Sequence, residues 1–393
     1  MAKLLLSCDE YIIVYKGEYY FRNDIDKHFF YRYLRVFENL KIACRCEMVR
    51  ALSDKMIPIK DPRIEVHYLT VFHGPQQYAK VWTKLNREIK NIAEGCDAAI
   101  LRLPSTIAQI IYPEVKKKKI PYCTEIVYDA YDGYNSETNI IKKLLWKIID
   151  KQMRKICNEA YGVSCVTERY LQRRYFSKKK NAFESYYSSL SLDPFFYSGP
   201  RTYPEKPIFL IAHVSDGIKF NGRKGIKELL NAVALLKEKG HEVRVSFAGG
   251  NKEWDSCKAL MEYASRLKIA DNVEIAGYLS REELNEFLEK ADIFVFPTKA
   301  EGLPRVLIEA MAKGLPCITT PVSGNPELIQ PEFLVDYYDV ECLSNKIWEL
   351  ATAKKTYENA SIANYYKSLE YQASILEKRR DIFYNKLKDC IES

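Results

Sequence analysis

The chain alternates between two patterns of hydrophobic positions. Short apolar runs rich in β-branched and aromatic residues predict buried strands, whereas apolar residues three or four positions apart predict amphipathic helices. Strand and helix alternate along the first half, which predicts a parallel sheet with helices on both faces. In that half, strands are predicted at residues 3–7, 11–15, 18–21, 41–48, 64–70, 98–103, 122–128 and 162–167, and helices at 26–40, 77–93, 106–115 and 140–160.

The second half repeats this alternation after a proline-rich segment. Residues 192–207 hold four Pro and one Gly, which is typical of a linker. We therefore expect an α/β chain of two Rossmann-like domains, residues 1–200 and 201–370. Beyond the linker, strands are predicted at 207–214, 243–248, 273–276, 292–297 and 315–320, and helices at 225–239, 255–267, 280–290, 304–313 and over most of 341–393.

Residues 291–327 carry the candidate chemistry. A buried strand ends at residue 297, a loop follows, and Pro304 suits the first helical position because its missing N–H is not needed there. The helix N-terminus presents free N–H groups and partial positive charge beside Gly302, which predicts an anion site, most simply for phosphate. Glu301 and Glu309 frame it, and carboxylates accept hydrogen bonds from hydroxyl groups. A phosphate site flanked by carboxylates that accept hydrogen bonds from hydroxyl groups matches the chemistry of a sugar nucleotide.

The same residues resemble the signature of retaining glycosyltransferases of family 4, which have the GT-B fold. The resemblance rests on Glu301 and Glu309 with seven residues between them, on the run EAMAKGLP that begins at Glu309, and on PVSGNPELI beyond it. It implies that Glu301 meets the donor sugar and that Glu309 binds the ribose. Backbone N–H groups at Gly302, Leu303 and the helix start at Pro304 would hold the diphosphate. The alternative is that both glutamates only solvate a loop and a helix face.

A basic loop, NGRKG at residues 221–225, lies at the same strand end. It resembles the Lys-Gly that opens this helix in family 4, where the lysine binds diphosphate. Lys224 is thus expected to bind diphosphate and Arg223 to add a forked contact, unless both belong to an exposed basic turn. Three glycines end neighbouring strands, where the nucleotide would lie against bare backbone: Gly249, Gly250 and Gly277.

The first domain departs from the family pattern in two places. No Gly-rich loop follows the first strand, because residues 9–23 contain Gly17 alone. Many members carry a His-Asp pair at the end of a central strand, and here the pair is Tyr128-Asp129. A Tyr hydroxyl donates and accepts hydrogen bonds, but it is no acid or base at pH 7. Tyr128 and Asp129 are therefore expected either to contact the donor sugar or to cap the strand.

The resemblance implies two domains that face each other across a cleft, with a C-terminal helix at about 371–393 packing back on the first. It implies a retaining glycosyltransferase that moves a sugar from a UDP- or GDP-sugar to a glycan or lipid-linked acceptor in surface polysaccharide biosynthesis. Glu301, Lys224 and Arg223 would carry the chemistry without a metal or cofactor, since no Asp-x-Asp pair or His/Cys cluster occurs. The alternatives are a nucleotide-sugar-binding protein without transfer activity, a GT-B sugar-nucleotide epimerase and a peripheral membrane scaffold.

Composition and charge indicate where in the cell the protein is expected. The chain is 47% hydrophobic and 28% charged, and no apolar run approaches the roughly 20 residues that span a bilayer. The N-terminal apolar stretch is too short for a signal peptide, which favours a cytoplasmic protein. The net charge of +8 comes with no nucleic-acid-binding signature, so no nucleic acid partner is expected. The basic runs at 116–119 and 173–180 are either a solvated face or a contact with the inner face of an anionic membrane.

Overall fold

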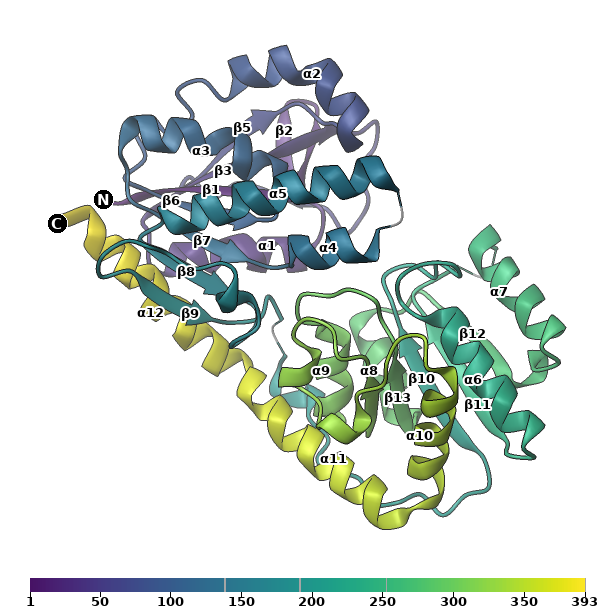
Figure 1. Ribbon diagram of the computed structural model, residues 1–393. Helices are drawn as coiled ribbons and strands as arrows, with labels where there is room; N and C mark the ends of the chain where they lie inside the picture. Colours follow the sequence, from purple (N-terminus) through teal and green to yellow (C-terminus); the bar gives the residue numbers. More distant parts are fainter. Residues whose placement is uncertain (138, 191, 252, 393) are drawn as a thin grey trace. The chain divides into compact units, whose positions relative to one another are not determined.

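The computed structural model describes residues 1–393 except 138, 191, 252 and 393 (Figure 1). The chain divides into two compact units. Unit 1 comprises Met1–Tyr131, Leu144–Tyr187 and Glu377–Ser393, and unit 2 comprises Asp132–Lys143 and Ser188–Leu376. Each unit has a sheet of its own, and each sheet is built mainly of parallel strands.

The sheet of unit 1 has seven parallel strands in the order β5-β3-β1-β6-β7-β8-β9, among the described residues, and the short strands β2 and β4 extend it in antiparallel fashion. The strands are β1 (Lys3–Tyr15), β2 (Glu18–Phe21), β3 (Asn39–Met48), β4 (Ile57–Pro58), β5 (Ile64–Leu69), β6 (Ala98–Leu103), β7 (Tyr122–Ile126), β8 (Gly162–Cys165) and β9 (Phe183–Tyr186). The helices of this part of the chain are α1 (Asp24–Tyr31), α2 (Gly74–Glu88), α3 (Thr106–Lys118), α4 (Ala130–Ser136), α5 (Ile140–Asn158) and the C-terminal α12 (Ala373–Glu392).

Two predictions for the first half were wrong in extent. The predicted strands at 3–7 and 11–15 are one strand, β1, whose register with β3 shifts between Ser7 and Tyr11. The helix predicted at 26–40 ends at Tyr31, because Asn39 and Leu40 pair with the start of β1. In both cases pairing with a central strand outweighs the local periodicity, since strand pairing depends on residues far away in the sequence.

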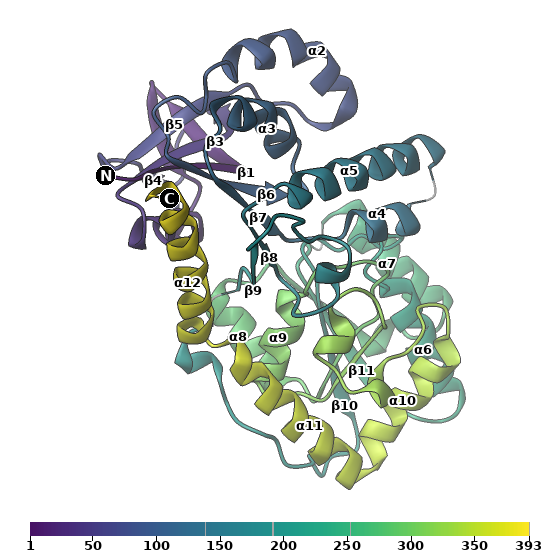
Figure 2. The same cartoon turned by 60° about the vertical axis from the view of Figure 1, so that its left-hand side comes forward.

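Glu125 of β7 is a buried carboxylate that accepts a hydrogen bond from the C-terminal helix α12. Figure 2 shows α12 running beside β8 and β9 of the same unit. Burial by itself would raise the pKa of Glu125, but the cations Arg32 and Arg102 outweigh it and hold the pKa below its ordinary value. The removal of this carboxylate would leave buried cations without a counter-charge. Its partners are the hydroxyls of Tyr33 at 2.8 Å, Tyr187 at 3.0 Å and Tyr384 of α12 at 2.6 Å, with Arg32 at 3.6 Å and Arg102 at 3.3 Å.

Unit 2 holds a parallel five-stranded sheet in the order β12-β11-β10-β13-β14. The chain runs outward from β10 to β12 on one side and then starts again at β13 on the other, so the order reverses between β10 and β13. Later helices cover earlier ones: α10 packs on α6 and α11 packs on α9. The strands are β10 (Phe209–Val214), β11 (Val243–Ala248), β12 (Val273–Gly277), β13 (Ile293–Phe296) and β14 (Cys317–Thr319), and the helices are α6 (Ile226–Glu238), α7 (Asp255–Arg266), α8 (Arg281–Lys290), α9 (Arg305–Ala312), α10 (Val340–Thr352) and α11 (Lys354–Ser368).

The elements of the second half follow the predicted pattern closely. Each predicted strand there is present, and the capping box at Ser280 and Glu283 opens α8 as expected. The fold class is thereby confirmed as α/β with two Rossmann-like units. Over the residues that the structure describes, no helix is both long and apolar enough to cross a bilayer.

Candidate donor site

The candidate site of unit 2 lies at the carboxyl ends of β10 and β13, where the strand order reverses. In open α/β sheets, ligands bind in the crevice beyond the strand ends at such a reversal. The loop after β10 leads to Lys224 and then to α6, and the loop after β13 leads through Glu301 to α9. Two segments that are 77 residues apart in sequence thus supply side chains to one place.

Lys224 and Glu301 form a direct ion pair between Nζ and Oε1. Both side chains are mostly buried, with exposed fractions of 23% for Lys224 and 12% for Glu301. The Lys224 ammonium also lies 5.1 Å from the centre of the Phe296 ring, within the range of a cation–π contact. Lys224, predicted to bind phosphate, and Glu301, predicted to bind the sugar, are therefore paired with each other.

Thr298 is a third member of this cluster that the sequence did not reveal. It is fully buried, and its Oγ1 lies 3.1 Å from Glu301 Oε1 and 3.1 Å from the carbonyl oxygen of Arg223. The same carbonyl accepts a 2.8 Å hydrogen bond from the backbone N–H of Lys299. These contacts join the two loops by their backbones, whereas the Arg223 side chain is exposed.

Helix α9 begins one residue later than predicted, since Pro304 is its N-cap and Arg305 its first residue. The loop before α9 is hydrogen-bonded to the segment that follows β14. Ser323 Oγ and the Gly324 N–H both donate to the Gly302 carbonyl, at 3.0 Å and 3.1 Å. Within the described part of the chain, the backbone N–H groups of Gly302 and Leu303 donate to no protein acceptor, although both residues are buried. Buried N–H groups normally have partners, so these two are donors available to a bound anion.

Glu309 lies in the second turn of α9, and its carboxylate is an unused acceptor. The residue is half-buried, and among the described residues its carboxylate has no hydrogen-bond or ion-pair partner. Burial raises the pKa of Glu309, and the nearby Arg305 and Arg281 offset part of that rise. A carboxylate that is partly removed from water and has no partner is stabilised when hydroxyl groups of a ligand donate hydrogen bonds to it.

Two glycines set the close approach of the loops. Gly225 has φ +70° at the N-cap of α6, and a Cβ there would lie 1.8 Å from the Pro297 carbonyl oxygen. Gly249 has φ +108°, and a Cβ there would lie 1.6 Å from the Ser215 carbonyl oxygen. Any side chain at either position would push apart the strand ends that form the site.

The remaining predicted glycines differ in their surroundings. Gly250 is packed against Ile218 and Cys257, whereas an added Cβ at Gly277 would meet nothing closer than 3.9 Å. Beside them, the half-exposed rings of Trp254 and Tyr278 meet edge to face with centres 5.2 Å apart. This aromatic pair was not predicted from the sequence, in which its one signal was its position shortly after two glycine-ended strands.

Tyr128 and Asp129 belong to unit 1 and follow β7. Asp129 is buried and accepts hydrogen bonds from the Tyr131 N–H at 2.9 Å and the Tyr175 hydroxyl at 2.8 Å. Burial raises the pKa of Asp129, and these two donors limit the rise. The geometry of Asp129 is that of a cap between β7 and α4, and the ring of Tyr128 lies 5.9 Å from that of Trp146.

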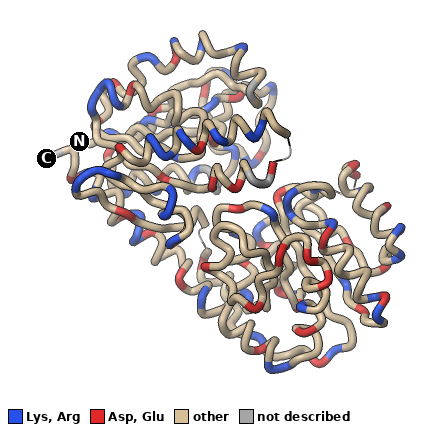
Figure 3. The backbone as a smooth tube through the Cα atoms, viewed as in Figure 1, with Lys and Arg blue, Asp and Glu red and all other residues tan. Residues whose placement is uncertain are grey.

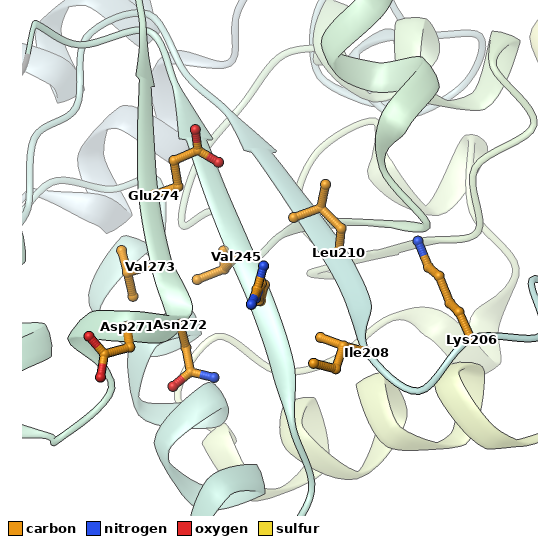
Figure 4. A pocket seen from close by; sticks show the side chains of 9 residues that line it. Lys206, Ile208, Leu210, Val245, Asp271, Asn272, Val273 and Glu274 are labelled. Carbon is orange, nitrogen blue, oxygen red and sulfur yellow. The ribbon is translucent and has the colours of Figure 1, made fainter.

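A cavity of about 530 Å³ lies at the opposite end of the unit 2 sheet (Figure 4). Its walls include Ile208, Leu210, Arg244 and Val273, which stand at the amino ends of β10, β11 and β12. Lys206 at its edge is already paired with Asp292 at 2.6 Å. The candidate site lies at the carboxyl ends of the strands, where ligands of parallel α/β sheets bind, so this cavity at the amino ends is separate from it.

Comparison with known proteins relates unit 2 to one family. Residues 211–367 match the sequence profile of the glycosyl transferases group 1 family. The chain carries a glycosyl transferases group 1 domain. The matched residues contain the whole candidate site of unit 2, and the match confirms the prediction of a glycosyltransferase.

The individual relatives of this chain are distant in sequence. Protein CapJ of Staphylococcus aureus is 24% identical over 377 residues, which cover 93% of this chain and 90% of that protein. The putative colanic acid biosynthesis glycosyltransferase WcaL of Escherichia coli K12 is 31% identical over 134 residues, 32% of each chain. The capsular polysaccharide biosynthesis glycosyltransferase CapM of Staphylococcus aureus is 26% identical over 182 residues, 45% of this chain and 46% of that one. Apart from CapJ, these relatives are therefore matched over less than half of their length.

Solved structures confirm the fold along nearly the whole chain. Sucrose-phosphate synthase from Thermosynechococcus elongatus superposes with a TM-score of 0.74 at 14% identity, covering 99% of this chain and 100% of that one. HepE from Anabaena, in complex with UDP, superposes with a TM-score of 0.67 at 16% identity, covering 98% of this chain and 100% of that one. At these identities the likeness concerns the fold alone.

Proposed function

We propose that this chain is a retaining, metal-independent glycosyltransferase that moves a sugar from a nucleotide-sugar donor to a glycan or lipid-linked acceptor in polysaccharide biosynthesis. The observation that carries the proposal is the Lys224–Glu301 pair beside the unpartnered N–H groups of Gly302 and Leu303. Its relatives WcaL and CapM, named for colanic acid and capsular polysaccharide biosynthesis, support the acceptor class. HepE, with UDP and UDP-glucose in its structures, supports a UDP-sugar donor.

The leaving diphosphate would bind where positive charge and free donors meet. The N–H groups of Gly302 and Leu303 and the start of α9 offer hydrogen bonds and a favourable dipole. Lys224 would turn from Glu301 to the phosphates, and the exposed guanidinium of Arg223 would close on them from the same loop. Charge that develops on the leaving group is thereby stabilised, which is typically the largest catalytic term.

The two glutamates would hold the two sugars of the donor. Once Lys224 moves to the phosphates, Glu301 has acceptor capacity for the hydroxyls of the transferred sugar. Glu309, which lacks a partner among the described residues, would accept from the ribose hydroxyls. Gly249, Gly250 and Gly277 would lie beneath the nucleotide.

No protein base is required in this mechanism. The acceptor would attack from the face that the diphosphate leaves, and a leaving-group oxygen would take the acceptor proton. His213 of β10 is unsuited to proton transfer, because burial lowers its pKa to about 4 and its Nδ1 lies 2.9 Å from the Val295 carbonyl oxygen.

The proposal is tested by incubating the protein with UDP- and GDP-sugars. Release of nucleoside diphosphate and transfer to a glycan acceptor are expected, and NMR should find the donor's anomeric configuration in the product. An inverted product would refute the retaining mechanism. Thermal stabilisation by sugar nucleotides without turnover would identify a binding protein instead, and epimerised donor without transfer would identify an epimerase.

Activity is expected to persist in EDTA. Among the described residues, no group of three or more His, Cys, Asp and Glu side chains is placed to hold a metal ion, and metal independence stays a prediction until it is measured. The rate of diphosphate release should be equal before and after chelation, with donor and enzyme concentrations held constant. Loss of activity that Mg²⁺ or Mn²⁺ restores would contradict the proposed mechanism, in which Lys224 and the start of α9 stabilise the leaving diphosphate without a metal.

Replacement of Lys224 by Ala is expected to weaken binding of both donor and free nucleoside diphosphate. The lost charge-assisted contact corresponds to about 1.5–3 kcal/mol, or roughly a 10- to 150-fold rise in Kd. Calorimetry with nucleoside diphosphate measures it. Lys227→Ala, at an exposed lysine in the first turn of α6, is the matched control and should leave Kd unchanged. Equal affinities for the parent and Lys224→Ala would mean that Lys224 does not meet phosphate.

A further inference from the structure

Helix α5 presents large apolar side chains to solvent. Ile140 is 84% exposed, Ile141 72%, Leu144 60% and Ile148 46%. α5 is one continuous helix, so positions 140, 144 and 148 share a face by its own periodicity. The other side of the helix is packed, since Met153, Ile156 and Cys157 are buried. The exposed apolar face is thus additional to the face that α5 uses in the fold.

The same exposed side of α5 is basic. Lys147, Lys151 and Lys155 are exposed and follow the apolar positions along it, and lysine and arginine recur over the whole helix (Figure 3). The one acidic residue in the α5 sequence, Asp150, is buried and occupied by Arg154 at 2.7 Å and the Tyr175 hydroxyl at 3.0 Å. Among the described residues, Lys147, Lys151 and Lys155 form no ion pair, so the outer side of α5 combines apolar side chains with positive charge.

We propose that α5 docks this protein on the surface of an anionic phospholipid bilayer. An amphipathic helix with lysines beside its apolar face lies in the membrane interface, where the apolar side chains enter the acyl boundary and the lysines meet lipid phosphates. A protein partner of complementary shape would have to desolvate these lysines, whereas an anionic lipid surface neutralises them in place. This docking does not involve the donor site, so binding to vesicles can be measured without a sugar nucleotide.

The basic run at 116–119, which the sequence analysis left open as a membrane contact, is a weaker candidate. Lys116 is paired with Glu159 at 2.5 Å, Lys117 with Glu114 at 3.9 Å and Lys118 with Glu94 at 3.4 Å. Charges with carboxylate partners attract anionic lipid less, and this run carries no exposed apolar face. It provides a charge control for α5.

The experiment is flotation of the full chain with phosphatidylcholine vesicles that contain either no anionic lipid or about 30% phosphatidylglycerol. The protein should float with the anionic vesicles only. Leu144→Ser/Ile148→Ser is expected to weaken partitioning about tenfold or more, and so is Lys147→Gln/Lys151→Gln. Ile362→Ser/Ile382→Ser, at half-exposed positions on α11 and α12, and Lys116→Gln/Lys117→Gln should partition like the parent.

Three results would overturn the proposal: parent protein that ignores anionic vesicles, α5 variants that partition like the parent, and control variants that lose binding as strongly as the α5 variants. Sedimentation velocity tests whether a second copy of the chain covers α5 instead. A parent dimer that Leu144→Ser/Ile148→Ser converts to monomers would show this and would also overturn the proposal. Diphosphate release from soluble donor should be equal in all variants. Vesicle binding can therefore be absent while the protein still transfers sugar, and sugar transfer can be absent while the protein still binds vesicles.

Discussion

Replacement of Glu301 by Gln is expected to lower turnover about 10²- to 10³-fold. The substitution keeps the volume but exchanges an acceptor-only carboxylate for a neutral amide. In the structure this carboxylate lies 3.1 Å from Oγ1 of the buried Thr298, a contact that does not depend on Lys224 and holds its position before the donor arrives. A preorganised acceptor that orients the sugar acts mainly in the transition state, and its loss should appear in kcat.

Glu309→Gln is the matched substitution, made eight positions later on α9. It should lower affinity for free nucleoside diphosphate by about 1–3 kcal/mol, because the ribose hydroxyls lose a charged acceptor. Glu301→Gln should change that affinity little, since the free diphosphate carries no transferred sugar. Calorimetry and a turnover assay on both variants read out the difference. Normal turnover of Glu301→Gln would reduce this residue to a solvated loop carboxylate and remove the basis of the proposed mechanism.

Replacement of Glu125 by Gln is expected to destabilise unit 1 by about 3–5 kcal/mol, because it leaves Arg32 and Arg102 buried without their counter-charge. For a unit of this size, such a loss lowers the melting temperature by about 6–20 °C. Differential scanning calorimetry measures the shift, and hydrogen exchange in β7 and α12 assigns the transition to unit 1, since a two-unit chain need not unfold in one step.

The same carboxylate predicts acid sensitivity. The folded pKa of Glu125 lies below the ordinary value of 4.5, so its stabilisation is complete above that value and is lost as pH falls through the folded pKa. Glu125→Gln should therefore flatten the acid limb of the stability curve of unit 1. Glu94→Gln is the control, because Glu94 is 64% exposed beside Lys118 and its loss should cost about 0–1 kcal/mol. A similar effect of both substitutions would show that Glu125 is not the charge that holds the cluster.

The sequence by itself determined the architecture of unit 2 and the location of its candidate site. Strong apolar runs, glycine-ended strands and the capping box at Ser280 are local signals, and each corresponds to an element in the structure. The order of strands and helices also placed Glu301 and Lys224 at the same sheet edge, because the carboxyl ends of parallel strands meet there.

Only the tertiary structure decided which of these residues touch. Nothing local in the sequence shows that Lys224 pairs with Glu301, or that buried Thr298 joins the two loops, because those contacts depend on β10 and β13 being neighbours. The continuous β1, the early end of α1 and the gathering of Tyr33, Arg102 and Tyr384 around Glu125 have the same origin. Periodicity reports which face of an element is buried, whereas the partners that cover that face come from distant parts of the chain, so their identity follows from packing alone.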